Sequence, residues 1–126
     1  MIIKGKDRKF LLTVRGRDEI AALCPNGDLS NISDMLSATS STEFLRKMTI
    51  IMNRDYEDHT KYYDPSYEPE YLTDDDLEIL TLEEFRKLND EMSDAFLKGM
   101  GVTVETDDKK GKKTAKRGTA STKSNP

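Results

Sequence analysis

The sequence predicts an α+β fold in which an N-terminal β-hairpin packs on a mainly α-helical body of about four to five helices. β-prone runs precede residue 15, whereas apolar residues recur at helical spacing from residue 17 to residue 101. After residue 101 the apolar pattern ends, and Lys, Ser, Thr and Gly predominate. We therefore expect a single domain over residues 1–101, with the hairpin in 1–14 and the helical body in 17–101, followed by a disordered basic tail over 102–126.

Two β-prone runs, Met1–Lys4 and Lys9–Val14, flank a polar segment and predict the hairpin. An isolated two-stranded hairpin is at best marginally stable in water, so its apolar face must lie on the helices or on strands of another chain. Its free edge would then be a docking surface. We expect Arg15-Gly16 to separate the hairpin from the first helix.

The spacing of apolar residues predicts a short helix that begins at Arg17, directly after this break. Its apolar face is formed by residues at positions i, i+3 and i+4: Ile20, Leu23 and Cys24. Its first turn would carry two carboxylates, which suit the positive end of the helix dipole: Asp18 and Glu19.

Pro25 is expected to end this helix, because the residue before a proline is disfavoured in the helical conformation. Asn26-Gly27 is a turn dipeptide that tolerates positive φ, and Asp28 can cap the next helix. That second helix is expected to extend to about Ser37, with four apolar residues on one face: Leu29, Ile32, Met35 and Leu36. Turn chemistry would therefore set the angle between the two helices.

The longest helix is expected over roughly residues 41–58. Ser40 and Glu43 have the spacing of a capping box at its start. Its apolar stripe is formed by Phe44, Leu45, Met48, Ile51 and Met52, and Ile50 widens it. A stripe of this width indicates contacts on more than one side of the helix.

Residues 59–72 interrupt the helical pattern with prolines and tyrosines, and they predict an ordered extended strap. Two capping boxes follow, Thr73 with Asp76 and Thr81 with Glu84. They predict a helix of one or two turns and then a final amphipathic helix that ends near residues 99–101. The apolar stripe of the final helix is Leu82, Phe85, Leu88, Met92, Phe96 and Met100.

No group of residues has the spacing of a catalytic or metal site, so we expect no enzyme activity, no cofactor and no metal. The only histidine, His59, follows Asp58 with Asp55 one turn earlier, but no nucleophile has a sequence reason to lie near them. Cys24 lies on an apolar stripe and is expected to be a buried structural thiol. The acidic run 74–76 lacks the ligand spacing of a calcium loop and is expected to cap a helix.

Charge is distributed unevenly along the chain. The formal net charge of −4 combines +2 over residues 1–53, −10 over residues 54–101 and +4 over residues 102–126. This dipolar pattern favours self-association or a charged protein partner, and a solvated surface explains it equally well. The basic tail around residues 109–117 could contact phosphates, but it has no interleaved aromatic residues, so nucleic acid is not the expected partner.

A single cysteine excludes an internal disulfide, and no run approaches 18 apolar residues, so no membrane span is expected. The N-terminal segment lacks the apolar core of a signal peptide, which predicts a cytoplasmic protein. A body of about 100 residues buries only a modest core, so oligomerisation would add stability.

Three parts of the chain form a recognisable pattern: residues 10–14 leading into 19–29, then Asn53-Arg54-Asp55-Tyr56-Glu57, then Asp64-Pro65-Ser66-Tyr67. In this pattern the chain resembles the small tail assembly chaperones encoded by tailed bacteriophages and prophages of Gram-positive bacteria. The likeness covers most of residues 10–101. It consists of small motifs and includes no catalytic signature.

The resemblance implies a non-enzymatic protein that binds the tape measure protein, a long hydrophobic helical chain, and keeps it soluble until tail tube subunits polymerise around it. It implies the tape measure protein and the major tail tube protein as partners, together with self-association. It also implies a host-cytoplasmic protein that is not retained in the mature virion. A longer product made by ribosomal frameshifting is common in this family, and slippery codons can encode the lysine pairs Lys109-Lys110 and Lys112-Lys113. The predicted hairpin departs from the all-helical form of the best-known members.

The side chains predicted to contact the partner are six apolar residues of the two longest helices: Phe44, Met48, Met52, Phe85, Met92 and Phe96. The methionines among them suit a packed core equally well. Two other functions remain open. One is a structural tail completion or connector subunit of the virion, and the other is a small nucleic-acid-binding regulator that uses the basic tail.

Overall fold

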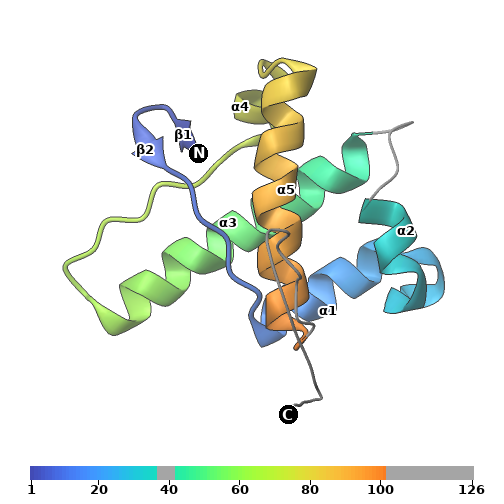
Figure 1. Cartoon of the computed structure of the whole chain (residues 1–126). Helices are drawn as coiled ribbons and strands as arrows, with labels where there is room; N and C mark the ends of the chain where they lie inside the picture. The colour runs from blue at the N-terminus through green and yellow to red at the C-terminus, as the bar shows by residue number, and fades with distance from the viewer. Residues whose placement is uncertain (37–41, 102–126) are drawn as a thin grey trace, which may run out of the picture.

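The computed structural model describes residues 1–36 and 42–101, and within them it has the predicted α+β architecture (Figure 1). A two-stranded antiparallel hairpin precedes five α-helices in this part of the chain. The elements are β1 (Ile2–Ile3), β2 (Lys6–Asp7), α1 (Val14–Leu23), α2 (Ile32–Leu36), α3 (Glu43–Tyr63), α4 (Asp74–Glu78) and α5 (Leu82–Gly99). Two short 3₁₀ helices, Pro25–Gly27 and Leu29–Asn31, connect α1 to α2.

Helices α3 and α5 cross at the centre of the fold, and α1 and α4 also contact α3 (Figure 1). The buried apolar side chains join one cluster to which β1 and all five helices contribute. They are Ile3, Ile20, Cys24, Ile32, Leu45, Met48, Met52, Leu72, Leu77, Phe85, Leu88, Met92 and Phe96. The hairpin and the helices therefore share a core, and the hairpin is stabilised by this contact.

The hairpin is shorter than the sequence predicts. Its second strand is Lys6–Asp7, and the expected strand Lys9–Val14 is not formed. Lys4 and Gly5 both have positive φ, 56° and 78°, which is the geometry of a tight two-residue turn. Because the turn falls here, Ile3 pairs with Lys6, and the residues after Asp7 leave the sheet to lie along α3.

Helix α1 begins at Val14, three residues earlier than predicted, because Thr13 caps it by accepting a hydrogen bond from the backbone N–H of Gly16 at 2.9 Å. The predicted break at Arg15-Gly16 is therefore wrong, and Asp18 and Glu19 lie beyond the first turn. A glycine is required at position 16, since a Cβ there would collide with Oδ2 of Asp55.

The junction after α1 confirms the sequence prediction. Helix α1 ends at Leu23, directly before Cys24 and Pro25. Asn26 and Gly27 have positive φ, 59° and 66°, and Asp28 accepts a hydrogen bond from the backbone N–H of Ser30. Helix α2 then extends to Leu36, while Ser37 lies outside the described residues.

Helix α3 extends to Tyr63, five residues beyond the predicted end, so the extended strap begins at Asp64. Its N-cap is Thr42, which makes no side-chain capping bond, and Ser40 of the predicted capping box lies outside the described residues. Both later capping boxes are confirmed, Thr73 with Asp76 at α4 and Thr81 with Glu84 at α5. The predicted tail 102–126 also lies outside the described residues.

Candidate functional site

The structure places five of the six predicted partner-contact side chains in the core. Met48, Met52, Met92 and Phe96 have no exposed surface, and Phe85 is 5% exposed. The stripes of α3 and α5 are directed at the shared core, so these side chains hold the two helices together. In this fold they offer almost no surface to a partner, and their contact with a partner stays a prediction.

Two of the six predicted residues reach surface hollows. Phe44 is half-buried and lines a hollow of about 220 Å³ with Leu23, Glu43 and Lys47. Phe85 lines a second hollow, of about 130 Å³, where α4 meets α5.

One exposed apolar side chain lines the second hollow, and another lies close to it in the sequence. Ile79 is 84% exposed and lies in the turn between α4 and α5, and Leu82, which lines the hollow, is 65% exposed. Arg46 closes one side of the hollow and pairs with Asp74 at 2.8 Å. We use the name α4–α5 corner for Leu82, Phe85, the hollow that they line and the neighbouring exposed Ile79. It has the apolar centre and charged rim that are typical of protein interfaces.

Sequence reasoning missed the exposure of this corner. Its spacing places Leu82 in the apolar stripe of the last helix, but Leu82 is the first residue of α5 and is 65% exposed. Ile79 fits neither neighbouring stripe. The available signal was an apolar residue that lies outside both stripes and two positions before a capping threonine.

A set of buried polar side chains lies along the C-terminal half of α3, and we call Asn53, Asp55 and Glu57 the polar seam. All three are at most 1% exposed. Asn53 accepts a hydrogen bond from the backbone N–H of Leu72 and donates one to the carbonyl of Lys9, both at 3.1 Å. It therefore joins the strap to the N-terminal segment through α3.

Asp55 anchors the start of α1. Its carboxylate accepts hydrogen bonds from the hydroxyl of Thr13 at 2.7 Å and from the guanidinium of Arg15. The neighbouring Arg54 also donates to Asp55 and makes a two-point contact with Glu19, each bond 3.0 Å long. Charged pairs of this geometry fix the angle between α1 and α3.

Glu57 joins the hairpin and the strap to α3. Its Oε1 atom accepts hydrogen bonds from Lys6 Nζ at 2.6 Å, from the hydroxyl of Tyr67 at 2.8 Å and from the backbone N–H of Glu70 at 2.9 Å. Burial raises the pKa of Glu57, but these donors outweigh it and hold the pKa below its ordinary value of 4.5. Lys6 Nζ also lies 4.7 Å from the centre of the Tyr67 ring.

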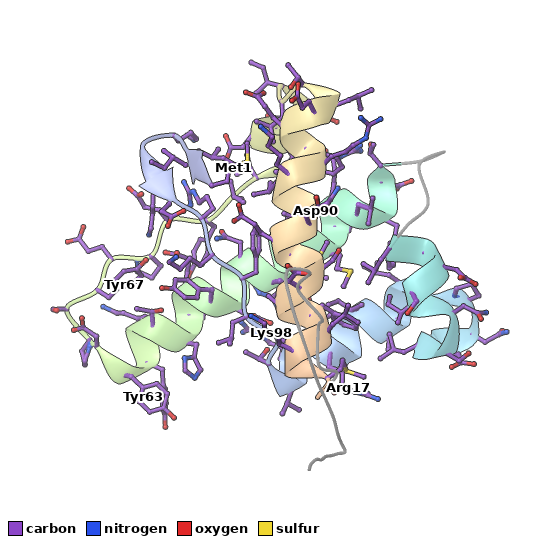
Figure 2. The ribbon with its side chains drawn as sticks, in the orientation of Figure 1. Met1, Arg17, Tyr63, Tyr67, Asp90 and Lys98 are labelled. Carbon is purple, nitrogen blue, oxygen red and sulfur yellow. The ribbon has the colours of Figure 1, made fainter. Side chains whose placement is uncertain are left out.

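His59 and the neighbouring Asp58 contact different side chains. The ring of His59 lies 4.9 Å from that of Tyr63, which points away from the body at the end of α3 (Figure 2). Asp58 accepts hydrogen bonds from Tyr71 and Arg15. Burial raises its pKa, but these two donors outweigh that effect and lower it overall. These contacts give Asp58 a structural role.

Cys24 is buried, and burial raises the pKa of its thiol, as expected for a structural cysteine. The acidic run 74–76 is used in capping and ion pairing: Asp76 caps α4 and pairs with Lys4, while Asp74 pairs with Arg46. No group of three or more candidate metal ligands occurs within residues 1–36 and 42–101.

Comparison with family models, curated proteins and solved structures finds no match for this chain. None of the helices in the described ranges is long and apolar enough to cross a membrane.

Proposed function

We propose that this chain is a non-enzymatic phage tail assembly chaperone that binds the tape measure protein and keeps it soluble in the host cytoplasm during tail assembly. The resemblance noted in the sequence suggests this role. We also propose that this chaperone is released from the tail before the virion is complete.

The observation that carries the proposal is that the motifs of the resemblance contact one another in the fold. Thr13 of the first motif binds Asp55 of the second, and Glu19 binds Arg54. Tyr67 of the third motif donates to Glu57 of the second. Motifs far apart in sequence therefore form one structural unit, and their polar groups are used to hold segments together. A shared scaffold is the kind of signature that a binding protein without a catalytic centre would carry.

The α4–α5 corner is the surface that best suits an apolar helical partner. Ile79 and Leu82 are exposed on either side of Thr81, and the hollow lined by Phe85 could accept an apolar side chain of the partner. An amphipathic helix presents such side chains at regular spacing, and a tape measure protein has many of them.

Co-expression of the chain with the tape measure protein encoded in the same genome tests the proposal. We expect more of the tape measure protein in the soluble fraction with the chain than without it. Equal amounts in the two cases would reject the chaperone function.

Variants of the corner test where the partner binds. Ile79→Ser and Leu82→Ser are each expected to weaken binding roughly tenfold, because exposed apolar side chains contribute strongly at the centre of an interface. Val14→Ser is the matched control, since Val14 is 82% exposed at the start of α1 and outside the corner. An equal effect of all three substitutions would place the contact elsewhere.

Mass spectrometry of purified virions separates the proposal from a structural tail subunit. A chaperone is expected to be depleted from the particle. A fixed stoichiometric amount in the virion would instead support a tail completion or connector subunit.

A further inference from the structure

A groove of about 610 Å³ runs between the N-terminal segment and the last turns of α5. Residues 8–12 form one side, and the other side is formed by Glu91, Asp94, Ala95, Lys98 and Gly99. The segment runs beside α5 in the same direction (Figure 1), and Lys98 lies on the side of α5 that borders it (Figure 2). At the closed end the two walls touch, since a Cβ added to Gly99 would lie 2.6 Å from Cβ of Leu12.

One edge of this N-terminal segment is bonded to α3. The backbone N–H of Leu11 donates to the carbonyl of Met52 at 3.1 Å, and the carbonyl of Lys9 accepts from Asn53. In an extended chain the backbone groups of alternate residues point to opposite edges, so those of Phe10 and Leu12 belong to the other edge. These groups have no hydrogen-bond partner among the described residues. An extended segment with one unpaired edge is a template for a further strand.

The chain leaves α5 at the closed end of the groove. Gly101 has a φ of +85°, and its N–H donates to the carbonyl of Lys98 at 3.0 Å. A left-handed glycine at this position ends the helix. The chain therefore leaves α5 next to Lys98 and Gly99, which line the groove.

The next five residues belong to the tail that we expected to be disordered, but they have the composition of a strand: Val102-Thr103-Val104-Glu105-Thr106. Five extended residues span about 16 Å, and α5 rises about 12 Å between Glu91 and Gly99. We propose that residues 102–106 of this chain occupy the groove and pair as a strand, antiparallel to Phe10–Leu12. A register with Val104 opposite Phe10 places Glu105 opposite Lys9, an opposite charge that already pairs with Asp7 at 3.1 Å.

Amide hydrogen exchange of the full-length chain, followed by NMR, tests this pairing. The amides of Phe10 and Leu12 are expected to exchange about tenfold or more slowly in the natural chain than in a Val102→Pro/Val104→Pro variant, because proline cannot sustain the strand pairing. Thr114→Pro/Ala115→Pro is the matched control and is expected to keep the slow exchange. The amide of Leu11, which is bonded to Met52, is the internal reference and should stay protected in all three chains.

Equal exchange of Phe10 and Leu12 in all three chains would overturn the proposal. Slow exchange that grows with protein concentration, together with a dimer mass in sedimentation, would also overturn it and assign the groove to a second copy. The natural chain can also be tested without substitutions, by measuring nuclear Overhauser contacts in dilute solution. Contacts between residues 102–106 and Phe10 or Leu12 would support the pairing, and their absence would reject it.

Discussion

The N-terminal half of α3, residues 43–52, contributes apolar side chains to the core shared with α5, whereas the C-terminal half, residues 53–63, binds extended segments through polar side chains. In the first half the buried apolar residues are Leu45, Met48 and Met52. In the second half the buried residues are those of the polar seam. One continuous helix thus uses two different physical means of holding its neighbours.

The difference between the halves follows from what each half binds. A helix such as α5 satisfies its own backbone hydrogen bonds and offers an apolar face, so burial of apolar surface is sufficient. The N-terminal segment and the strap have backbone groups with no partner of their own. Asn53 and Glu57 supply those partners at Lys9, Leu72 and Glu70. Segments without regular structure are therefore placed by side chains that act as hydrogen-bond partners for their backbone.

The largest effect is expected in the apolar half. Met48→Ala should lower the free energy of unfolding by about 3 kcal/mol, because it leaves a cavity at a fully buried position. Urea denaturation measures the loss. Met100→Ala is the matched control, since Met100 is 38% exposed, and it should cost much less. Similar losses for the two variants would show that the core does not depend on this stripe.

In the polar half, Asn53→Ala should cost about 2 kcal/mol, because it leaves the Leu72 N–H and the Lys9 carbonyl without partners in a buried site. The Asn53→Ala variant should also loosen the structure locally around the strap. Its amide exchange should accelerate at Leu72 more than at core positions of α5. Asn31→Ala, at an exposed position, should leave stability nearly unchanged. A uniform acceleration across the protein would mean that Asn53 supports the whole core and does not specifically hold the strap.

Acidification should distinguish Glu57 from a surface carboxylate. The pKa of Glu57 is lowered in the folded protein, so its contribution to stability is present above the unfolded value of about 4.5 and is lost as the pH falls through the folded pKa. Glu57→Gln should therefore lose less free energy of unfolding than the natural chain between about pH 7 and about pH 3. Glu68→Gln, at an exposed position, should keep the natural pH dependence. Equal pH dependence of all three chains would contradict the role of Glu57.

The smallest effects concern ion pairs at the surface of the two halves. Arg54→Ala should cost about 1 kcal/mol, because Arg54 is 29% exposed and binds both Glu19 and Asp55. Lys47→Ala removes an exposed pair with Glu43 and should cost about 0.3 kcal/mol. Thermal unfolding of both variants measures the two losses of stability. A larger loss for Lys47→Ala than for Arg54→Ala would contradict this prediction.

The sequence predicted the apolar half of α3 far better than the polar half. Apolar spacing identified Leu45, Met48 and Met52 as one face, and capping boxes located the starts of α4 and α5. The same spacing could not separate core from partner surface, so the buried Met92 and Phe96 were assigned to partner contact. Periodicity shows that a face is buried but does not identify what covers it.

The polar half could not be predicted for a physical reason. Asn53, Asp55 and Glu57 are residue types that usually face water, and only the contacts with distant segments make their burial favourable. The end of α3 was misplaced for a related reason, since Tyr62 and Tyr63 belong to an exposed final turn that carries no core signal. The start of α1 did carry a readable signal, because Thr13 precedes Gly16 by the spacing of an N-cap bond.

The long-range contacts of Arg8 constrain the order in which the segments of the protein fold during translation. Its guanidinium is buried and donates to the carbonyl of Glu70, 62 positions later, and Lys6 binds Glu57, 51 positions later. Residues 1–13 therefore leave the ribosome before α3 and the strap are synthesised. The contacts of Lys6 with Glu57 and of Arg8 with Glu70 cannot form until those later residues have emerged. A segment that is synthesised before α3 thus reaches its final position only after α3 and the strap are present.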